Sequence, residues 1–134
     1  MAAKKRVLII DDDDDFRSSV TSLLESEGYE VSGADSGHEG LRRLRTVHPD
    51  LVVLDIMMEN VTEGYAVNQA IKFQPSFAEL ASVPVLMVSS ITETPDELFG
   101  RAGEVDMIRP DRYLTKPLDI PRFLEVVAQI TSRN

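Results

Sequence analysis

Reactive side chains follow several short apolar runs in this sequence. They are two adjacent carboxylates, a third carboxylate, a hydroxyl and an amine, carried by Asp11, Asp12, Asp55, Ser89 and Lys116. A carboxylate nucleophile, acids that can hold a metal, a hydroxyl donor and a positive point charge are the parts needed for phosphoryl transfer to an aspartate. These residue types therefore indicate phosphoryl transfer, provided that the fold brings them together.

Three carboxylates that met at one place would repel one another, because a like charge nearby disfavours ionisation. A divalent cation relieves this repulsion, and Mg²⁺ takes one or two carboxylates together with water and phosphate oxygens. Rival interpretations exist, since Asp55 could cap a helix or end a turn, and a helix N-terminus stabilises nearby acids. We assign Asp13–Asp15 to a helix start, and Asp11 and Asp12 to a metal.

Short apolar runs and helical spacings predict the elements that position these groups. The predicted strands are 7–10, 30–31, 51–55, 83–88 and 112–115, and the predicted helices begin near residues 16, 36, 64, 94 and 119. The second strand is weak and loses its pattern at Ser32–Gly33. Side chains expected to face inward include Val67, Ala70 and Ile71 in the third helix, and Phe123, Leu124, Val127 and Ile130 in the last. The histidines, His38 and His48, are expected at the surface.

Alternation of strands and helices predicts an α/β fold, with a parallel sheet, right-handed crossovers and helices on both faces. All strand ends then lie at one edge, which is where open α/β sheets bind ligands. The chain of 134 residues suits one domain, and the stretch after Lys116 has room for one helix and no output domain.

Charge and composition exclude several functions. The net charge of −9 argues against nucleic-acid binding, because phosphates would repel the protein. The sequence has no long apolar stretch and no signal peptide, so we expect no membrane association. It also has no cysteine, which fits a reducing compartment, and we expect a cytoplasmic protein.

Four segments together resemble the receiver domains of two-component response regulators: Val7–Asp12, Pro49–Met58, Pro84–Ser90 and Tyr113–Pro117. The resemblance covers nearly the whole chain in the family's order. It implies a doubly wound, five-stranded parallel sheet of flavodoxin-like order 2-1-3-4-5. It also implies that residues 1–134 form a single receiver domain, with a core of about 5–131.

The resemblance implies a role for each matching residue. Asp55 would accept the phosphoryl group, and the metal, Mg²⁺ or Mn²⁺, would be held by Asp11, Asp12, Asp55 and the backbone carbonyl of Met57. Binding of the phosphoryl group and the conformational switch would fall to Ser89, Ser90, Lys116 and Tyr113, with a cis bond before Pro117. The partners would be a histidine kinase or phosphotransfer protein and a downstream protein target.

The predicted function is a phosphorylatable switch rather than an enzyme, although it assists its own phosphorylation and dephosphorylation. One alternative is a degenerate receiver that acts as a phosphorylation-independent interaction module. Another is a phosphohydrolase with an aspartyl nucleophile, but such enzymes carry a second aspartate where this chain has Met57. Met57 and Ile91 occupy the positions that would orient an attacking water, and both are apolar, so slow loss of phosphate is expected.

Three segments depart from the family's pattern. The loop after Asp55 is longer and lacks the usual proline near Glu59, and the connector 74–82 is also longer. Residues 99–111 lack the usual Gly-Ala turn into the last strand. The third departure leaves open whether 99–111 forms a special output surface.

Overall fold

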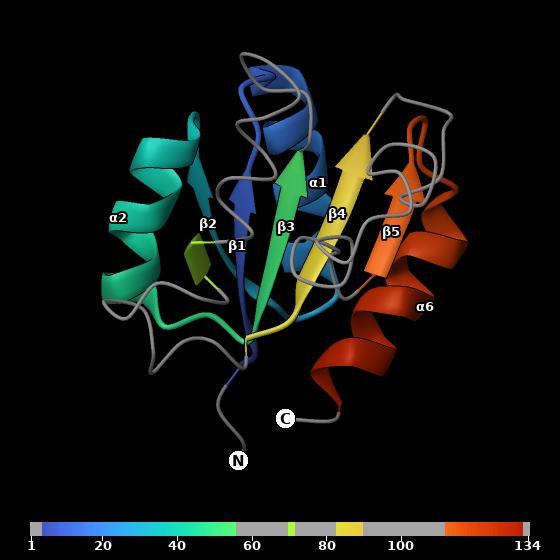
Figure 1. Ribbon diagram of the computed structural model, residues 1–134. Helices are drawn as coiled ribbons and strands as arrows, with labels where there is room; N and C mark the ends of the chain where they lie inside the picture. Colours follow the sequence, from blue (N-terminus) through green and yellow to red (C-terminus); the bar gives the residue numbers. More distant parts are fainter. Residues whose placement is uncertain (1–3, 56–69, 72–82, 90–111, 133–134) are drawn as a thin grey trace, which may run out of the picture.

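Five parallel strands form one sheet in the computed structural model, which describes residues 4–55, 70–71, 83–89 and 112–132. The strands are β1 (Arg6–Ile10), β2 (Glu30–Ala34), β3 (Leu51–Asp55), β4 (Val85–Ser89) and β5 (Arg112–Thr115). Their order is β2-β1-β3-β4-β5, and every neighbouring pair is parallel (Figure 1). The predicted fold class and strand order are confirmed.

Helices cover both faces of the sheet (Figure 1). Alternate strand residues contribute to two apolar clusters, because successive side chains of a strand point to opposite faces. One cluster contains Leu8 and Val52 with Leu44 of α2 (Gly37–Val47). The other contains Val7, Ile9, Leu51 and Val53 with side chains of α1 (Asp14–Ser26) and α6 (Ile120–Thr131). Burial on both faces explains why the central strands read as continuous apolar runs.

The first helix begins at the acidic run, as predicted, and ends at Ser26, two residues before the predicted stop at Gly28. The side chain of Asp13 is the N-cap of α1 and accepts hydrogen bonds from the backbone N–H groups of Asp15 and Phe16. Gly28 has φ 93°, a conformation that glycine adopts without steric cost. The aspartates Asp13–Asp15 therefore form a helix start, where the helix dipole favours negative charge.

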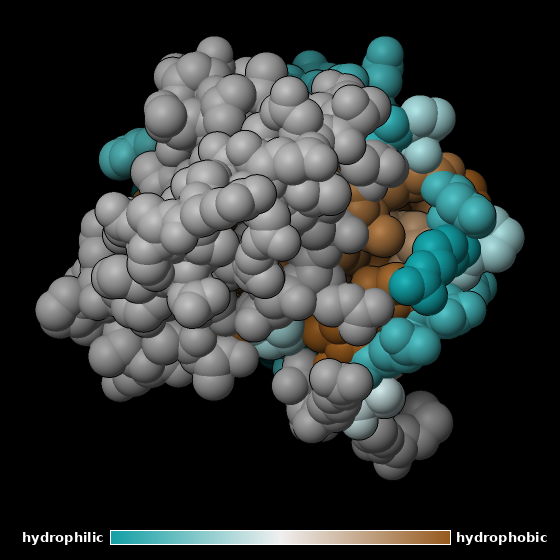
Figure 2. Space-filling view, turned by 45° about the vertical axis from the view of Figure 1, so that its right-hand side comes forward, coloured by the Kyte–Doolittle hydropathy of each residue, from teal (hydrophilic) through white to brown (hydrophobic). Residues whose placement is uncertain are grey.

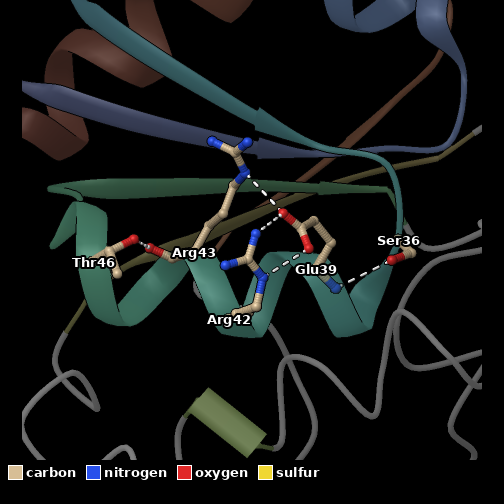
Figure 3. A network of polar contacts seen from close by, with 5 residues as sticks. All are labelled: Ser36, Glu39, Arg42, Arg43 and Thr46. Carbon is tan, nitrogen blue, oxygen red and sulfur yellow. Dashed lines mark hydrogen bonds and ion pairs between the residues drawn. The ribbon is translucent and has the colours of Figure 1, made fainter.

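Helix α2 carries a network of charged side chains on its outer surface (Figure 3). Ser36 is the N-cap and accepts a hydrogen bond from the N–H of Glu39, as its sequence position predicted. The Glu39 carboxylate accepts two hydrogen bonds from Arg42, of 3.0 and 2.5 Å, and one of 3.1 Å from Arg43. On the sheet side, a Cβ added at Gly40 would lie 2.5 Å from Cδ1 of Ile10. The helix thus approaches β1 more closely than a larger residue would permit.

Helix α6 packs along β3 and the surrounding core through an apolar stripe. Asp119 is its N-cap, and Phe123, Val127 and Ile130 are buried as predicted. Leu124 is only half-buried, whereas Val126 is buried although the sequence reading did not single it out. Figure 2 shows apolar side chains at the surface beside the polar outer residues on the side of the molecule that carries α6.

The boundaries of β1, β2 and β4 differ from the prediction. β1 begins one residue earlier, at Arg6, and β4 ends one residue later, at Ser89. β2 continues through Gly33 to Ala34, because Gly33 pairs with Ile9 and the aliphatic part of Arg17 covers it in place of a side chain of its own. β4 begins at Val85 instead of 83, after Pro84, which has no N–H to donate.

Of the predicted helix 64–73, Ala70 and Ile71 are helical and buried, and Val67 lies outside the described residues. The helix expected near residue 94 also lies outside the described residues. His38 and His48 are both exposed, as expected. None of the described helices is long and apolar enough to cross a membrane.

Candidate functional site

Three carboxylates converge at the carboxyl edge of the central strands. β1 and β3 pair in register up to Ile10 and Leu54, so the next residues, Asp11 directly after β1 and Asp55 at the end of β3, lie at the same edge of the sheet. Asp11, Asp12 and Asp55 each offer an oxygen, and these oxygens all lie within 4.8 Å of one another. Asp11 and Asp55 are 1% and 5% exposed, whereas Asp12 is exposed to solvent. The sequence prediction that these acids meet is confirmed.

Asp11 is held by hydrogen bonds to two other segments, the end of β2 and the start of α1. Its N–H donates to the carbonyl of Ala34 (3.1 Å), which extends the β1–β2 pairing by one residue. Its Oδ1 accepts from the N–H of Asp13 (2.8 Å), and its carbonyl accepts from Nη1 of Arg17 (2.7 Å). Arg17 also forms an ion pair with Asp14. The start of α1 therefore holds the residue that directly follows β1.

Lys116 brings a positive charge to this group from the end of β5. Its Nζ lies 3.0 Å from Oδ2 of Asp11 and 3.7 Å from Oδ1 of Asp55. The lysine side chain is 21% exposed, so the contacts are partly shielded from water. The peptide bond between Lys116 and Pro117 is cis, the conformation that the resemblance implied.

Burial and the neighbouring acid both change the pKa of the Asp12 carboxyl. Loss of hydration and then the negative charge of Asp11 raise the pKa of the Asp12 carboxyl above its ordinary value. A backbone hydrogen bond and the ammonium of Lys116 act in the opposite direction and only partly compensate. A bound divalent cation would favour the ionised form of the Asp12 carboxyl.

The donor set fits a hard divalent cation. Three carboxylate oxygens from two strand ends can approach one ion, and oxygen ligands are those that Mg²⁺ and Mn²⁺ prefer. Three protein oxygens leave room for water and for a phosphoryl oxygen in an octahedral shell. The arrangement can therefore hold a cation beside a carboxylate that is itself a nucleophile.

The remaining predicted residues are placed by the backbone or lie outside the described part of the chain. Ser89 ends β4 and pairs with Thr115, one step beyond the Asp55–Val88 pair, so it belongs to the same edge of the sheet. Tyr113 lies in β5. Met57, Ser90 and Ile91 lie outside the described residues.

Two residues at the site were not assigned a role there from the sequence. The helical spacing of Phe16 with Val20 and Leu24 predicts only a core position for Phe16, yet its ring centroid lies 4.1 Å from Nζ of Lys116. Arg17 was not singled out, although it binds the Asp11 carbonyl. Their position in the sequence could have indicated a role at the site, because both residues lie in the first helical turn directly after the acids.

A family model described as the response regulator receiver domain matches residues 7–128, which is most of the chain. The chain belongs to this family. As a receiver domain it is a phosphoacceptor switch in two-component signalling, and the prediction from the sequence is confirmed at this level.

Curated relatives support the assignment to the receiver domains. The chain is 32% identical to Protein PilH of Pseudomonas aeruginosa, over 91% of this chain and 93% of that protein. It is 34% identical to the polar-differentiation response regulator DivK of Brucella ovis, over 78% of each chain.

Solved receiver domains share the fold. The CheY-like response regulator receiver domain protein from Methanospirillum hungatei has a TM-score of 0.78 and 27% identity, with 98% of this chain and 96% of that chain covered. The chemotaxis protein CheY4 of Vibrio cholerae has a TM-score of 0.78 and 25% identity, covering 96% of this chain and 99% of that chain.

Proposed function

We propose that Asp55 is the phosphoacceptor of this receiver domain and that a histidine kinase or a phosphotransfer protein is its donor. The observation that carries the proposal is the convergence of Asp11, Asp12 and Lys116 on the nearly buried Asp55. A carboxylate in this setting ends a paired strand, which limits its direction of attack, and it has the Lys116 ammonium beside it for the incoming phosphoryl oxygens. Positioning of the reacting groups, together with electrostatic stabilisation, provides most of the catalysis of phosphoryl transfer.

The transfer step follows from these positions. An oxygen of Asp55 forms a bond to phosphorus, and the bond from phosphorus to the donor's imidazole nitrogen breaks. The nitrogen keeps the electron pair, so the histidine returns to its neutral state after proton exchange. Lys116 would move its ammonium from the carboxylates toward a phosphoryl oxygen, and Ser89 would donate a hydrogen bond to another.

Asp11, Asp12, Asp55 and the backbone carbonyl of Met57 are the proposed ligands of Mg²⁺. When bound, the ion neutralises charge that develops on the phosphoryl oxygens. The carboxylates contribute by holding these oxygens within reach of one ion. Without a cation the phosphoryl group would meet three negative charges, and in the part of the chain that the structure describes Lys116 is the group that forms ion pairs with them.

The proposed product of the reaction is the phosphorylated protein itself. Each molecule accepts one phosphoryl group and acts as a signal, so it does not turn over a substrate. The phosphorylated protein would bind a downstream protein target differently from the unphosphorylated form, with Ser89 and Tyr113 as the residues that link the site to the surface. The domain is thus a regulator that assists its own phosphorylation and dephosphorylation. Because the proposed donor takes its phosphate from ATP, we propose a cytoplasmic location.

The test is phosphorylation by acetyl phosphate in the presence of Mg²⁺, followed by intact mass. Wild-type protein should gain one phosphoryl group, and Asp55→Asn should gain none. Asp15→Asn is the matched control, because Asp15 is an exposed aspartate close in sequence to the acids. Chelation of the metal should stop the reaction. If Asp55→Asn were labelled to the wild-type extent, the assignment would be wrong, and an unlabelled wild type would favour a degenerate receiver.

A further inference from the structure

The ammonium of Lys116 contacts an aromatic ring as well as two carboxylates. Its Nζ lies 4.1 Å from the centroid of the Phe16 ring, within the range of a cation–π interaction. The same nitrogen lies 3.0 Å from Asp11 and 3.7 Å from Asp55. We propose that Phe16 is a positioning residue for Lys116, and that its ring sets how well the lysine binds the phosphoryl group. The inference rests on the proposed function of Asp55.

The backbone of Phe16 is fixed relative to the acids. Its N–H donates to the N-cap side chain of Asp13 (3.2 Å), and the N–H of Asp13 in turn donates to Asp11. The next residue, Arg17, binds the carbonyl of Asp11. The half-buried ring also packs against the apolar cluster shared by α1 and α6. The ring is therefore held from the site side and from the core side.

A ring suits this position better than another acid. A lysine side chain is flexible, so it needs a contact that limits where its ammonium lies. A fourth carboxylate would hold the ammonium more strongly, but it would add negative charge where phosphoryl oxygens must enter. The face of Phe16 attracts the cation without adding a net charge. Lys116 thus keeps its full charge available when the phosphoryl group arrives.

A purely structural role for Phe16 makes a different prediction. If the side chain only filled the apolar cluster, leucine would replace it without effect on the lysine, because leucine is also apolar and packs in such clusters. If the ring positions Lys116, leucine should impair the lysine while tyrosine, which keeps the ring, should not. The pair Phe16→Leu and Phe16→Tyr therefore separates the two roles.

The first measurement concerns the lysine alone, in protein labelled with ¹³C-lysine and without any phosphodonor. An aromatic ring shifts the resonances of atoms over its face, so the Lys116 Cε and Hε signals should be displaced in the wild type. Phe16→Leu should remove this displacement, and Phe16→Tyr should keep it. Tyr29→Leu is the control, because Tyr29 packs at the edge of the same cluster and has no contact with Lys116 among the described residues.

The second measurement is binding of beryllofluoride, a mimic of the phosphoryl group, with saturating Mg²⁺. Phe16→Leu should weaken binding by roughly 2- to 30-fold, the range that a cation–π contact supports. Phe16→Tyr and Tyr29→Leu should bind like the wild type. The Mg²⁺ affinity without beryllofluoride should match the wild type in Phe16→Tyr and Tyr29→Leu. In Phe16→Leu it should be equal or slightly tighter, because a less ordered Lys116 competes less for Asp11, so weaker metal binding does not explain the loss of beryllofluoride affinity. Phe16→Met replaces Phe16→Leu if the leucine variant does not fold.

The outcomes distinguish this inference from the function on which it rests. Wild-type protein that does not bind beryllofluoride would refute the proposed phosphoacceptor site. Wild-type protein that binds it, together with equal binding by Phe16→Leu, would overturn the role of the ring alone. Loss of the lysine displacement and of affinity in Phe16→Leu, both retained in Phe16→Tyr, would support it.

Discussion

Nζ of Lys116 donates a hydrogen bond of 3.0 Å to Oδ2 of Asp11, a residue 105 positions earlier in the chain. The two residues follow β5 and β1, which are not neighbours in the sheet, so the lysine reaches across the ends of β3 and β4. The other oxygen of Asp11 accepts from the N–H of Asp13. Both carboxylate oxygens of Asp11 therefore already accept hydrogen bonds. A cation that binds Asp11 must compete with Lys116 for this carboxylate.

Removing the lysine should strengthen metal binding. We expect Lys116→Met to lower the dissociation constant for Mg²⁺ by about 5- to 10-fold, because a unit charge about 4 Å away contributes about 1 kcal/mol even in bulk water. Without metal the variant should lose about 1–3 kcal/mol of stability, since the buried Asp11 carboxylate loses a partner. Calorimetric titration and urea unfolding measure the two effects. Lys4→Met, at an exposed position, is the control, and unchanged Mg²⁺ affinity in Lys116→Met would contradict the competition.

A phosphoryl mimic should change the environment of Tyr113 through Ser89. A conformational shift requires a contact that differs between the two states, and a hydrogen bond from Ser89 to the phosphoryl group would be that contact. Beryllofluoride should therefore move the Tyr113 ring resonances in the wild type and move them less in Ser89→Ala. Tyr29, near Thr131 at the opposite end of the sheet, serves as the internal reference. Equal Tyr113 shifts with and without the Ser89 hydroxyl would rule out this link.

The phosphorylated state should be long-lived. Hydrolysis needs a water in line behind phosphorus, and the positions expected to orient it carry Met57 and Ile91, which offer no useful hydrogen bond. Met57→Asn and Ile91→Glu should each accelerate the loss of phosphate by roughly tenfold or more. Decay of the phosphoprotein after removal of the donor gives the rate, with Met57→Leu and Ile91→Val as apolar controls. If the wild-type phosphoprotein lost its phosphate as fast as the polar variants, Met57 and Ile91 would not control the rate of hydrolysis.

Acid should weaken the contribution of Glu39 to stability. Hydrogen bonds from Arg42, and secondarily from Arg43, lower the pKa of Glu39 from 4.5 to about 2. A pKa lowered by folding stabilises the folded state above the unfolded value, and the effect fades as the pH falls through the folded value. The stability difference between wild type and Glu39→Gln should therefore be constant above pH 4.5 and shrink between about pH 4.5 and pH 2. Urea unfolding across this range tests it, with Glu25→Gln as the control; a difference that persists at the acid end would contradict the shift.

The convergence of the acids followed from the sequence because it depends only on topology. Parallel strands end at one edge, so Asp11 and Asp55 had to meet once β1 and β3 were neighbours. The helix starts at Asp13, Ser36 and Asp119 were also predictable, since each cap is a local side-chain interaction.

Tertiary contacts account for what the sequence did not reveal. The full extent of β2 depends on Arg17 lying over Gly33, a contact between separate elements. The contact of Phe16 with Lys116 was also hidden, because helical spacing already explained Phe16 as a core residue. The burial of Val126 depends on how α6 is rotated against the sheet, which apolar spacing fixes only approximately.

The close approach at Gly40 constrains which sequences can encode this domain. A Cβ there would meet Cδ1, Cγ1 and Cγ2 of Ile10 at 2.5, 2.8 and 3.0 Å, so a larger residue at 40 is compatible only with a smaller one at 10. Ile10 directly precedes Asp11, so a change in side-chain size at position 10 would lie next to the proposed metal ligands. The two positions should therefore evolve as a pair. Selection from a library that varies position 40 alone should return glycine. A library that varies positions 10 and 40 together should also return larger residues at 40, paired with smaller ones at 10.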